Sequence, residues 1–269
     1  MNYDNVLFAF ALTLFAGLAT GVGSTVAFFK KEMSGSFLAG SLGFSAGVMI
    51  YVSMIEIFPK ANTSLSSIYG ESTGYLYTTI SFFLGIALIA IIDYLVPSAE
   101  NPHEVKSVCE MDNNKTRSKD EFMRMGLFSA LAIGIHNFPE GLATFIGAMN
   151  DPAIGISIAI AISIHNIPEG IAISVPVYYA TGSKKKAFKL SFLSGLAEPI
   201  GALAGFFILM PFMSDALFGI IFASVAGIMV YISLDELLPT AEKYGEHHIA
   251  IYGLISGMIV MAISLVLLI

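Results

Sequence analysis

The hexapeptide HNFPEG occupies residues 136–141 and recurs 29 positions later as HNIPEG at residues 165–170. Both copies lie within apolar sequence long enough to cross a bilayer. An ionisable side chain there costs roughly 3 kcal/mol or more and is by default a functional-site candidate. The alternative is a pair of proline kinks whose polar groups only satisfy each other. The repetition of the whole motif inside two apolar segments argues against that alternative.

Within each copy, the histidine and the glutamate are four residues apart. On a helix this spacing puts both side chains on one face about one turn apart, while the intervening asparagine points about 100° away. Pro139 and Pro168 have no N–H and clash with the carbonyl one turn back, so they should free backbone oxygens nearby. Two such helices facing each other would supply two imidazoles, two carboxylates and two amides. Zn²⁺ and similar ions accept this mixture, whereas Ca²⁺ and Mg²⁺ favour oxygen alone.

The composition is that of a polytopic membrane protein. Hydrophobic residues make up 56% of the chain and charged residues 12%, against about 25% charged in soluble domains; the mean hydropathy is +0.79. The net charge of −7 says little about partners, since several acids lie in apolar segments. No basic stripe suggests nucleic acid. Cys109 is the single cysteine, which excludes an intramolecular disulfide.

Eight membrane spans are predicted with a threshold of about 20 apolar residues per helix. They run approximately over residues 6–29, 37–58, 74–96, 122–148, 152–178, 187–210, 215–238 and 249–269. We expect one transporter domain over residues 1–269, with residues 97–121 as a flexible cytoplasmic loop. The metal-ligating side chains of this loop, His103, Glu104, Cys109, Glu110 and Asp112, are interpreted as parts of a solvated linker, as are His247 and His248.

The basic residues predict the orientation. With the N-terminus outside, the connections after spans one, three, five and seven face the cytoplasm and carry twelve of the thirteen basic residues. Only Lys60 falls outside. Because Lys and Arg concentrate in cytoplasmic loops, we expect a multi-pass protein of the cell membrane with both termini extracytoplasmic. Lys184–Lys186 is interpreted as a topology signal and not as a binding patch.

Internal similarity predicts an inverted repeat. Residues 46–59 resemble residues 226–239 at an offset of 180, and parts of span one match span six at an offset of 178. A displacement of five spans is odd, so matching helices should cross the membrane in opposite directions. The expected fold is all-α, with helices 1–3 inverted against helices 6–8 around the central pair 4–5. Such folds are typical of alternating-access transporters. Chance similarity among apolar helices is the alternative.

Four further acids in or at the ends of the spans are candidates for the metal pathway. Glu198 precedes Pro199 among small residues that allow close helix approach, and would add an oxygen ligand to the central cavity or cap a kink. Glu56 ends span two on the predicted outer side, and Asp235 and Glu236 end span seven on the predicted inner side. Carboxylates at both mouths of a pathway would attract and relay a divalent cation, although acids at helix ends are also common without such a role.

These motifs resemble the Zrt/Irt-like (ZIP) divalent metal transporters, most closely the bacterial ZupT-type branch. The two hexapeptides, the segment Ala197-Glu198-Pro199, the eight spans and the loop after the third carry the resemblance over essentially the whole chain. The resemblance implies import of Zn²⁺, and also of Fe²⁺, Mn²⁺, Co²⁺ or Cd²⁺, into the cytoplasm. It also implies a homodimer, and transport by rocking or sliding of one helix bundle against another.

The resemblance further implies a central site for two metal ions. The first ion would be held by His136, Glu140, His165 and Glu169; the second by Asn137, Glu140, Asn166, Glu169 and Glu198, with the two glutamates bridging. Asp235 and Glu236 match the cytoplasmic exit region. Some members have Gln-Asp where this chain has His165-Asn166. We therefore expect the first site to bind borderline-soft metals well and the second to be weaker or of different selectivity.

Two other functions would use the same residues. One is an intramembrane metal-dependent hydrolase, in which a bound metal activates water. It is disfavoured because the chain has no HExxH motif and the ligand set is symmetric, without an extra general base. The other is a metal exporter. No nucleotide-binding motif is present, so ATP should not drive transport. We expect neither an enzyme nor a cofactor, only the transported metal.

Overall fold

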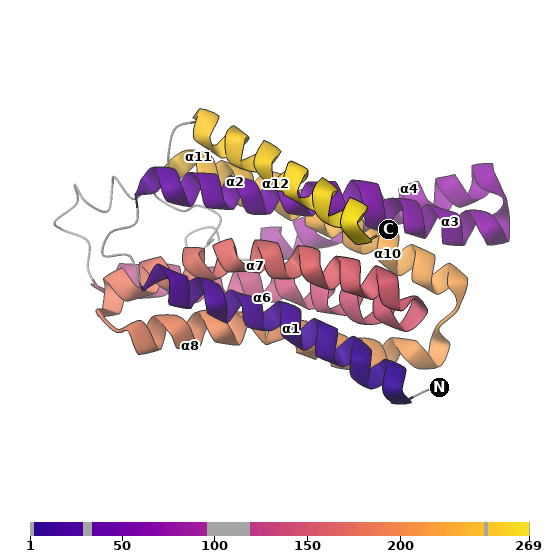
Figure 1. The fold of residues 1–269 in the computed structure, drawn as a ribbon, viewed down its shortest axis with the longest axis horizontal. Coiled ribbons are helices and arrows are strands. Elements are labelled where there is room, and N and C mark those ends of the chain that lie inside the picture. Colours follow the sequence, from indigo (N-terminus) through magenta and orange to yellow (C-terminus); the bar gives the residue numbers. More distant parts are fainter. Residues whose placement is uncertain (1–2, 29–33, 96–118, 245–246, 269) are drawn as a thin grey trace.

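The structure is a computed structural model that describes residues 3–28, 34–95, 119–244 and 247–268. Every regular element in these ranges is helical, which confirms the predicted all-α class (Figure 1). The α-helices are α1 (Tyr3–Ala27), α2 (Gly35–Val52), α3 (Phe58–Tyr69), α4 (Glu71–Leu95), α6 (Lys119–Asn150), α7 (Pro152–Thr181), α8 (Lys184–Gly195), α9 (Ala197–Ala204), α10 (Asp215–Ile232), α11 (Leu238–Tyr244) and α12 (His247–Leu268). Three π-helical turns, η1 (Ser53–Ile57), η2 (Gly205–Leu209) and η4 (Ser233–Leu237), and the 3₁₀ turn η3 (Met210–Phe212) lie between them.

Seven continuous helical segments in the described ranges are long and apolar enough to cross a membrane. They correspond to seven of the eight predicted spans. The remaining span, residues 122–148, lies within α6, a helix of 32 residues that packs among the others. The number eight therefore stays a prediction, while the multi-pass helical architecture is established.

Local sequence explains where several helices begin. Side chains of Ser34, Asp151, Ser183 and Ser214 accept hydrogen bonds from the first-turn N–H groups of α2, α7, α8 and α10. Such caps satisfy donors that the helix itself leaves unpaired. The joint between α3 and α4 is Gly70 alone, with φ of 81°, a conformation that favours glycine.

The second predicted span is too short. It was expected to end at residue 58, but the helix continues through η1 and α3 to Tyr69. The reason is a π-helical turn in front of Pro59, in which the N–H of Phe58 donates to the carbonyl of Ser53 five residues back. The extra residue accommodates a proline that would otherwise break the helix. The same turn precedes Pro211 and Pro239.

The prolines of the two hexapeptides do not interrupt their helices. Pro139 and Pro168 lie inside α6 and α7, which run without a break to Asn150 and Thr181. The sixth span is the one that is interrupted, at Leu196 between α8 and α9. The site therefore rests on two long continuous helices and one broken one.

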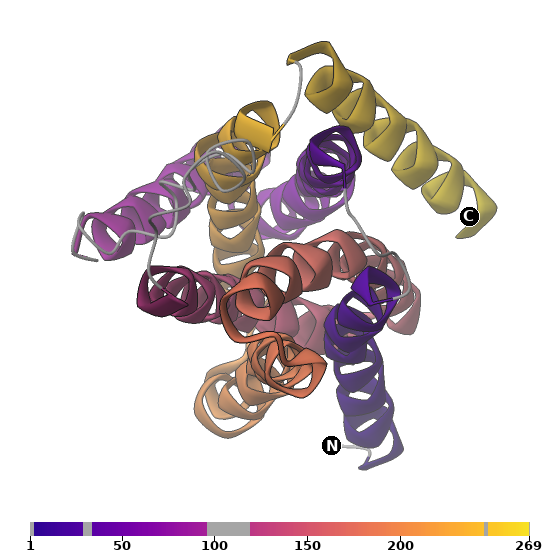
Figure 2. The same ribbon diagram turned by 90° about the vertical axis from the view of Figure 1, so that its left-hand side faces the viewer.

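Helices α6 and α7 form a middle layer. Helices α1 and α8–α9 pack on one side of this layer and α2 and α10 on the other, with α12 beside α2 and α4 beside α10 (Figure 2). Both chain ends lie at the same end of the molecule, and α8 begins at the opposite end (Figure 1). Side chains from α6 and α7 thus meet in the centre of the bundle.

Close contacts between helices recur at the predicted repeat offsets. Gly17 on α1 and Gly195 on α8 each face the other's carbonyl oxygen so closely that a Cβ would overlap it. Four other glycines each face a carbonyl on another helix, and they form two pairs at the repeat offsets. In the first pair, Gly23 faces the carbonyl of Ile167 and Gly201 faces that of Phe138. In the second pair, Gly47 faces the carbonyl of Leu254 and Gly227 faces that of Phe82. Helices α1 and α8–α9 run in opposite directions, as do α2 and α10 (Figure 1). These contacts support the predicted inverted repeat.

Candidate metal centre

The seven predicted metal ligands come from three helices. His136, Asn137 and Glu140 lie on α6; His165, Asn166 and Glu169 lie on α7. Glu198 begins the first turn of α9, directly after the break in the sixth span. All seven side chains are at most 2% exposed. So many polar groups in an apolar bundle are costly unless they are paired or bind an ion.

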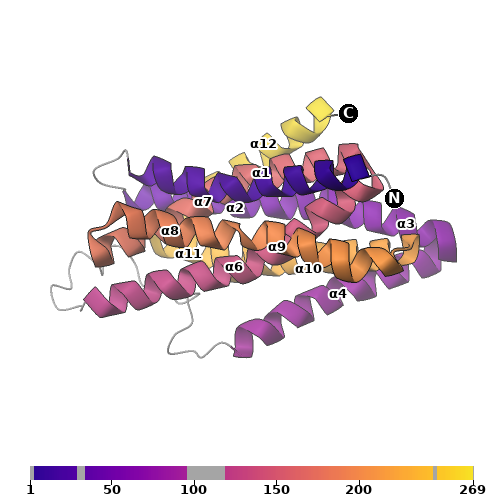
Figure 3. The same ribbon diagram turned by 90° about the horizontal axis from the view of Figure 1, so that it is seen from below.

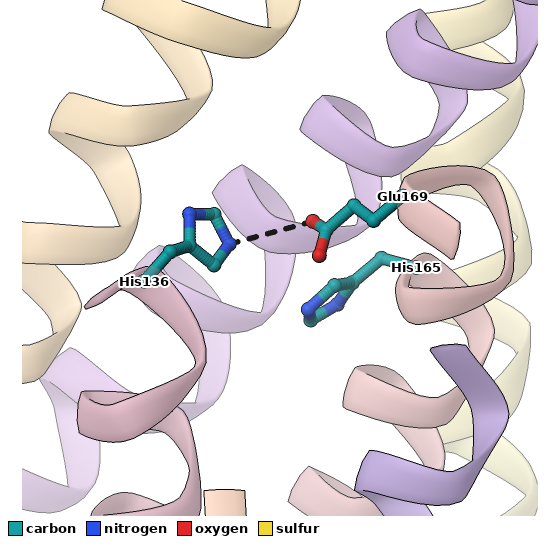
Figure 4. A group of neighbouring side chains, drawn as sticks. All are labelled: His136, His165 and Glu169. Carbon is teal, nitrogen blue, oxygen red and sulfur yellow. Dashed lines mark ion pairs between the residues drawn. The ribbon is translucent and has the colours of Figure 1, made fainter. Parts of the chain in front are cut away.

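Two imidazoles and two carboxylates converge at the centre. His136 Nε2 lies 3.3 Å from Glu140 Oε1 and 3.4 Å from Glu169 Oε1, and His165 Nε2 lies 3.2 Å from Glu140 Oε1. Figure 4 shows His136 reaching across from α6 toward Glu169, with His165 beside that carboxylate. Donor atoms that share a tetrahedral zinc ion at about 2.0–2.2 Å are roughly 3.3 Å apart. These three distances therefore match the spacing of a zinc site, and donor atoms of His136, His165 and Glu169 all lie within 4.8 Å of one another.

A second group of donors is unpaired. The amide oxygens of the two asparagines and one oxygen of each glutamate are buried without a hydrogen-bond partner: Asn137 Oδ1, Asn166 Oδ1, Glu140 Oε2, Glu169 Oε2 and Glu198 Oε2. A buried polar atom left unpaired costs about 1–3 kcal/mol. Five of them in one cluster call for an explanation, and a cation is the simplest. These are the five residues predicted to hold a second ion.

In both asparagines, the amide nitrogen is held by a hydrogen bond to the backbone. Asn137 Nδ2 donates to the carbonyl of Ser194 at 3.2 Å, and Asn166 Nδ2 donates to the carbonyl of Ala16 at 2.9 Å. Ser194 and Ala16 are related by the repeat offset of 178. Each amide is therefore fixed by the same backbone position of a related helix, which leaves its oxygen available to a ligand.

The two halves of the cluster differ at one ligand. Asn166 Nδ2 also donates to Glu198 Oε1. The position related to Glu198 by the repeat is Thr20 on α1, whose buried Oγ1 has no hydrogen-bond partner. The α9 side thus supplies a carboxylate where the α1 side supplies only a hydroxyl, so the oxygen-rich part of the cluster is asymmetric.

Ser45 on α2 belongs to the cluster although our sequence reasoning missed it. Its buried Oγ donates to Glu169 Oε1 at 3.4 Å and to the carbonyl of His165 at 3.3 Å. A signal was present, because the repeat-related residue at an offset of 180 is the apolar Val225. A hydroxyl in one span where its counterpart has valine indicates a local polar partner.

The acids predicted at the two mouths lie away from this centre. Glu56 is half-buried in η1, which leads into α3 at one end of the molecule. Asp235 is exposed and Glu236 half-buried in η4, which leads into α11 at the other end (Figure 1). Their placement on opposite sides of the cluster agrees with positions along a pathway, and their role stays a prediction.

The other side chains weighed in the sequence lie either outside the described residues or at the start of α12. His103, Glu104, Cys109, Glu110 and Asp112 lie outside the described residues, as do residues 97–118 of the expected loop. The two histidines that begin α12, His247 and His248, have ring centroids 5.6 Å apart. His247 Nδ1 lies 2.7 Å from Glu242 Oε1, and both side chains are exposed.

Comparison with known proteins agrees with this geometry. A family model described as ZIP zinc transporter matches residues 96–265. The chain is 64% identical over 264 residues to "Zinc transporter ZupT" of Chlorobaculum parvum, which covers 98% of each chain. It is 63% identical over 266 residues to the protein of the same name from Lysinibacillus sphaericus, covering 98% of this chain and 99% of the other. For the Streptococcus mutans protein of that name, the identity is 64% over 259 residues, covering 96% and 97%.

Proposed function

Because this chain belongs to the ZIP zinc transporter family, its function is transport of divalent metal across the membrane, and we propose that the buried cluster of α6, α7 and α9 holds the ion in transit. The protein is a transporter and not an enzyme. The observation that carries the proposal is the combination of four converging nitrogen and oxygen atoms with five unpaired buried oxygens. Zn²⁺ suits the first group best, since it accepts imidazole and carboxylate together.

The first ligand group can hold one ion without leaving a net charge in the membrane. Two ionised glutamates balance one divalent cation, and neutral imidazoles complete its shell. These ligands must be deprotonated to bind, so the metal replaces protons as well as water. Glu140 and Glu169 each direct one oxygen toward the histidines and keep a second one unpaired. We propose that both carboxylates bridge two ions.

The second ion would be held by oxygen atoms only. Its ligands would be the two asparagines, Glu198 and the free oxygens of the bridging glutamates. Amide oxygens carry no formal charge, so this site should bind more weakly than the first or with a different selectivity. An oxygen-only shell also favours harder ions such as Mn²⁺. The range of transported ions that we propose is Zn²⁺ with Fe²⁺, Mn²⁺, Co²⁺ and Cd²⁺, and no cofactor.

The proposed direction is import. Lys184–Lys186 begin α8 at the end of the molecule opposite both chain ends (Figure 1). Lysines concentrate on the cytoplasmic side, so both termini would be extracytoplasmic, with Glu56 near the outer mouth and Asp235 and Glu236 near the inner one. We also propose that the chain forms a homodimer, on the basis of its family alone.

Radiometal flux into proteoliposomes tests this function. We expect ⁶⁵Zn²⁺ to accumulate inside, and His165→Ala to reduce uptake and shift selectivity away from Zn²⁺ when Fe²⁺ or Mn²⁺ compete. Asn166→Ala should change Zn²⁺ selectivity less, because Asn166 contributes only to the second site. A larger change in selectivity from Asn166→Ala than from His165→Ala would contradict this division of roles.

The metal content of cells that produce the protein distinguishes the alternatives. Cells that produce an importer gain metal, and cells that produce an exporter lose it. An intramembrane hydrolase would leave the metal content unchanged. Loss of metal from cells producing this protein, with the loss abolished by His165→Ala, would overturn the import direction but keep the site.

A further inference from the structure

A large apolar groove lies on the side of the molecule away from α2. It is bordered by α4, α6, α8–α9 and α10, which are all labelled in Figure 3. Its volume is about 810 Å³, within the range of about 300–1,000 Å³ that ligand sites occupy. Nearly all of its lining is apolar, with Ile89, Phe138, Leu193, Ile200 and Val225 among the residues.

The groove opens on the outer surface of the helical bundle. Leu193 is 48% exposed and Ile200 is 56% exposed at its rim, while Val225 and Ile228 are buried in its floor. The opposite face of α8 is turned inward, since Ser191 Oγ donates to the carbonyls of Thr20 and Gly170, both at 3.3 Å. Three of the bordering segments, those that contain α4, α8–α9 and α10, have the length and hydropathy of membrane spans. The groove between them therefore faces the hydrocarbon region.

The two halves of the molecule differ at this place. On the repeat-related side, α2 packs directly on α7, and Ser45 Oγ reaches the carbonyl of His165 at 3.3 Å. Helix α10 contacts α6 less extensively, and Val225, the counterpart of Ser45, lines the groove instead. Among the described residues, no neighbouring helix fills the groove.

A positive charge lies at one end of the groove. Lys186 is exposed and precedes Leu190 and Leu193 by four and seven residues, so it shares the helix face that lines the groove. Lys184 points elsewhere, since its Nζ donates to the carbonyl of Phe28 on the α1 side at 3.2 Å. The groove thus offers apolar side chains along its length and an ammonium group at the membrane surface.

From this arrangement we infer that the groove is a binding site for one anionic phospholipid, with an acyl chain among α4, α6, α8–α9 and α10 and the phosphate beside Lys186. Basic residues between membrane helices on the cytoplasmic side commonly bind anionic head groups. The acyl chain matches the apolar lining of the groove, and the ammonium group of Lys186 favours an anionic head group. Lys186 would then bind lipid in addition to setting the orientation of the protein in the membrane.

The absence of tryptophan allows a direct test. Leu193→Trp places a single fluorophore in the groove of the full-length protein, reconstituted in phosphatidylcholine with a low mole fraction of phosphatidylglycerol carrying brominated chains. We expect the brominated lipid to quench the tryptophan fluorescence more than its mole fraction in the bilayer alone would predict. Phe15→Trp is the matched control, because residue 15 is related to residue 193 by the repeat and is 58% exposed on α1. Its quenching should follow the bulk composition.

Charge variants identify the head-group contact. Lys186→Gln in the Leu193→Trp protein should lower the relative affinity for phosphatidylglycerol about fivefold, or about 1 kcal/mol for one lysine near the surface. Lys185→Gln removes the same charge from a different face of α8 and should change it little. Ile200→Trp provides a second reporter, should Leu193→Trp fold poorly.

Three results would overturn the inference. They are equal quenching at positions 193 and 15, no quenching at the groove by any brominated lipid, and equal effects of the two lysine substitutions. The measurement involves no metal flux. A failed lipid site therefore leaves the transport proposal untouched, and failed transport leaves the lipid site testable.

Discussion

Two residues break the symmetry of the otherwise paired candidate metal centre. The histidines, asparagines and glutamates of the hexapeptides occur once on α6 and once on α7, but Ser45 and Glu198 have Val225 and Thr20 at the positions predicted to be related by the repeat. Both contact the ligands of α7: Ser45 the carboxylate of Glu169, and Glu198 the amide of Asn166. A symmetric site would bind an ion equally well from either side of the membrane. Ser45 and Glu198 therefore make the two sides of this site different.

Ser45→Ala should weaken metal capture without unfolding the protein. The substitution removes the donor to Glu169 Oε1 and to the His165 carbonyl, so Glu169 is held less firmly for the ion. We expect the KM for Zn²⁺ uptake to rise about fivefold, the effect of one hydrogen bond of about 1 kcal/mol, with little change in the maximal rate.

Ser224→Ala is the matched control for Ser45→Ala. Ser224 Oγ donates to the carbonyls of Ile220 and Ser81 and lies on the related helix α10 without contacting a ligand. Its replacement should leave the KM unchanged. Equal KM values for Ser45→Ala and the unaltered protein would show that Ser45 does not position Glu169.

Glu198→Gln should remove the second ion and keep the first. The amide still offers an oxygen to Asn166 Nδ2, but the negative charge that the oxygen-only site needs is lost. Equilibrium dialysis followed by elemental analysis should show bound Zn²⁺ falling from two ions per chain to one. Retention of two ions would exclude Glu198 as a ligand, and loss of both would mean that the two sites are not separable.

At the scale of the helices, glycines set how closely the site can be assembled. A Cβ at Gly141 on α6 would overlap the carbonyl of Glu198 on α9, whereas nothing lies within 4 Å of the corresponding position at Gly134 on the same helix. We expect Gly141→Ala to push α9 outward, cost about 1–3 kcal/mol through overpacking, and abolish uptake by displacing Glu198.

Gly134→Ala serves as the control on the same helix. Alanine is the better helix former by about 1 kcal/mol, so this variant should match or exceed the thermal stability of the unaltered protein and transport normally. Melting temperature in detergent and ⁶⁵Zn²⁺ uptake measure the two effects. Normal uptake by Gly141→Ala would show that the contact between α6 and α9 does not hold the site together.

The spacing of the hexapeptides was sufficient to predict which helices meet. Histidine and glutamate at i and i+4 must share a face, and two such faces in apolar surroundings satisfy each other best by facing one another. The structure buries all seven predicted ligands and brings the side chains of the two histidines and two glutamates together. Figure 4 shows three of these four. Ser45 was missed because a single serine in an apolar span has many possible partners, and the sequence does not say which helix lies opposite.

Helix ends and helix breaks were harder to predict than helix identity. Hydropathy stops at the polar residues after Pro59, yet the π-helical turn of η1 carries the helix on to Tyr69. Pro139 and Pro168 are tolerated inside continuous helices, while the break occurs at Leu196. Proline disfavours a local hydrogen bond, but neighbouring helices decide whether the backbone bends, shifts by one residue or separates.

Over the whole molecule, the two halves of the predicted repeat share their glycine contacts but differ in how their helices pack. The glycine contacts at Gly23 and Gly201, and at Gly47 and Gly227, are duplicated. Yet α2 lies against α7 while α10 leaves a groove beside α6. The two predicted halves therefore differ in how their helices pack on α6 and α7 more than in these glycine contacts.

The orientation of the whole molecule is testable with the chain's single cysteine removed. In a Cys109→Ser background, Lys60→Cys and Lys185→Cys each introduce one exposed thiol, on α3 and on α8 at opposite ends of the molecule (Figure 1). Lysine clusters are retained on the cytoplasmic side. A membrane-impermeant maleimide should therefore label Lys60→Cys in intact cells, and Lys185→Cys only after permeabilisation. The reverse pattern would place both termini in the cytoplasm and exchange the proposed outer and inner mouths of the pathway.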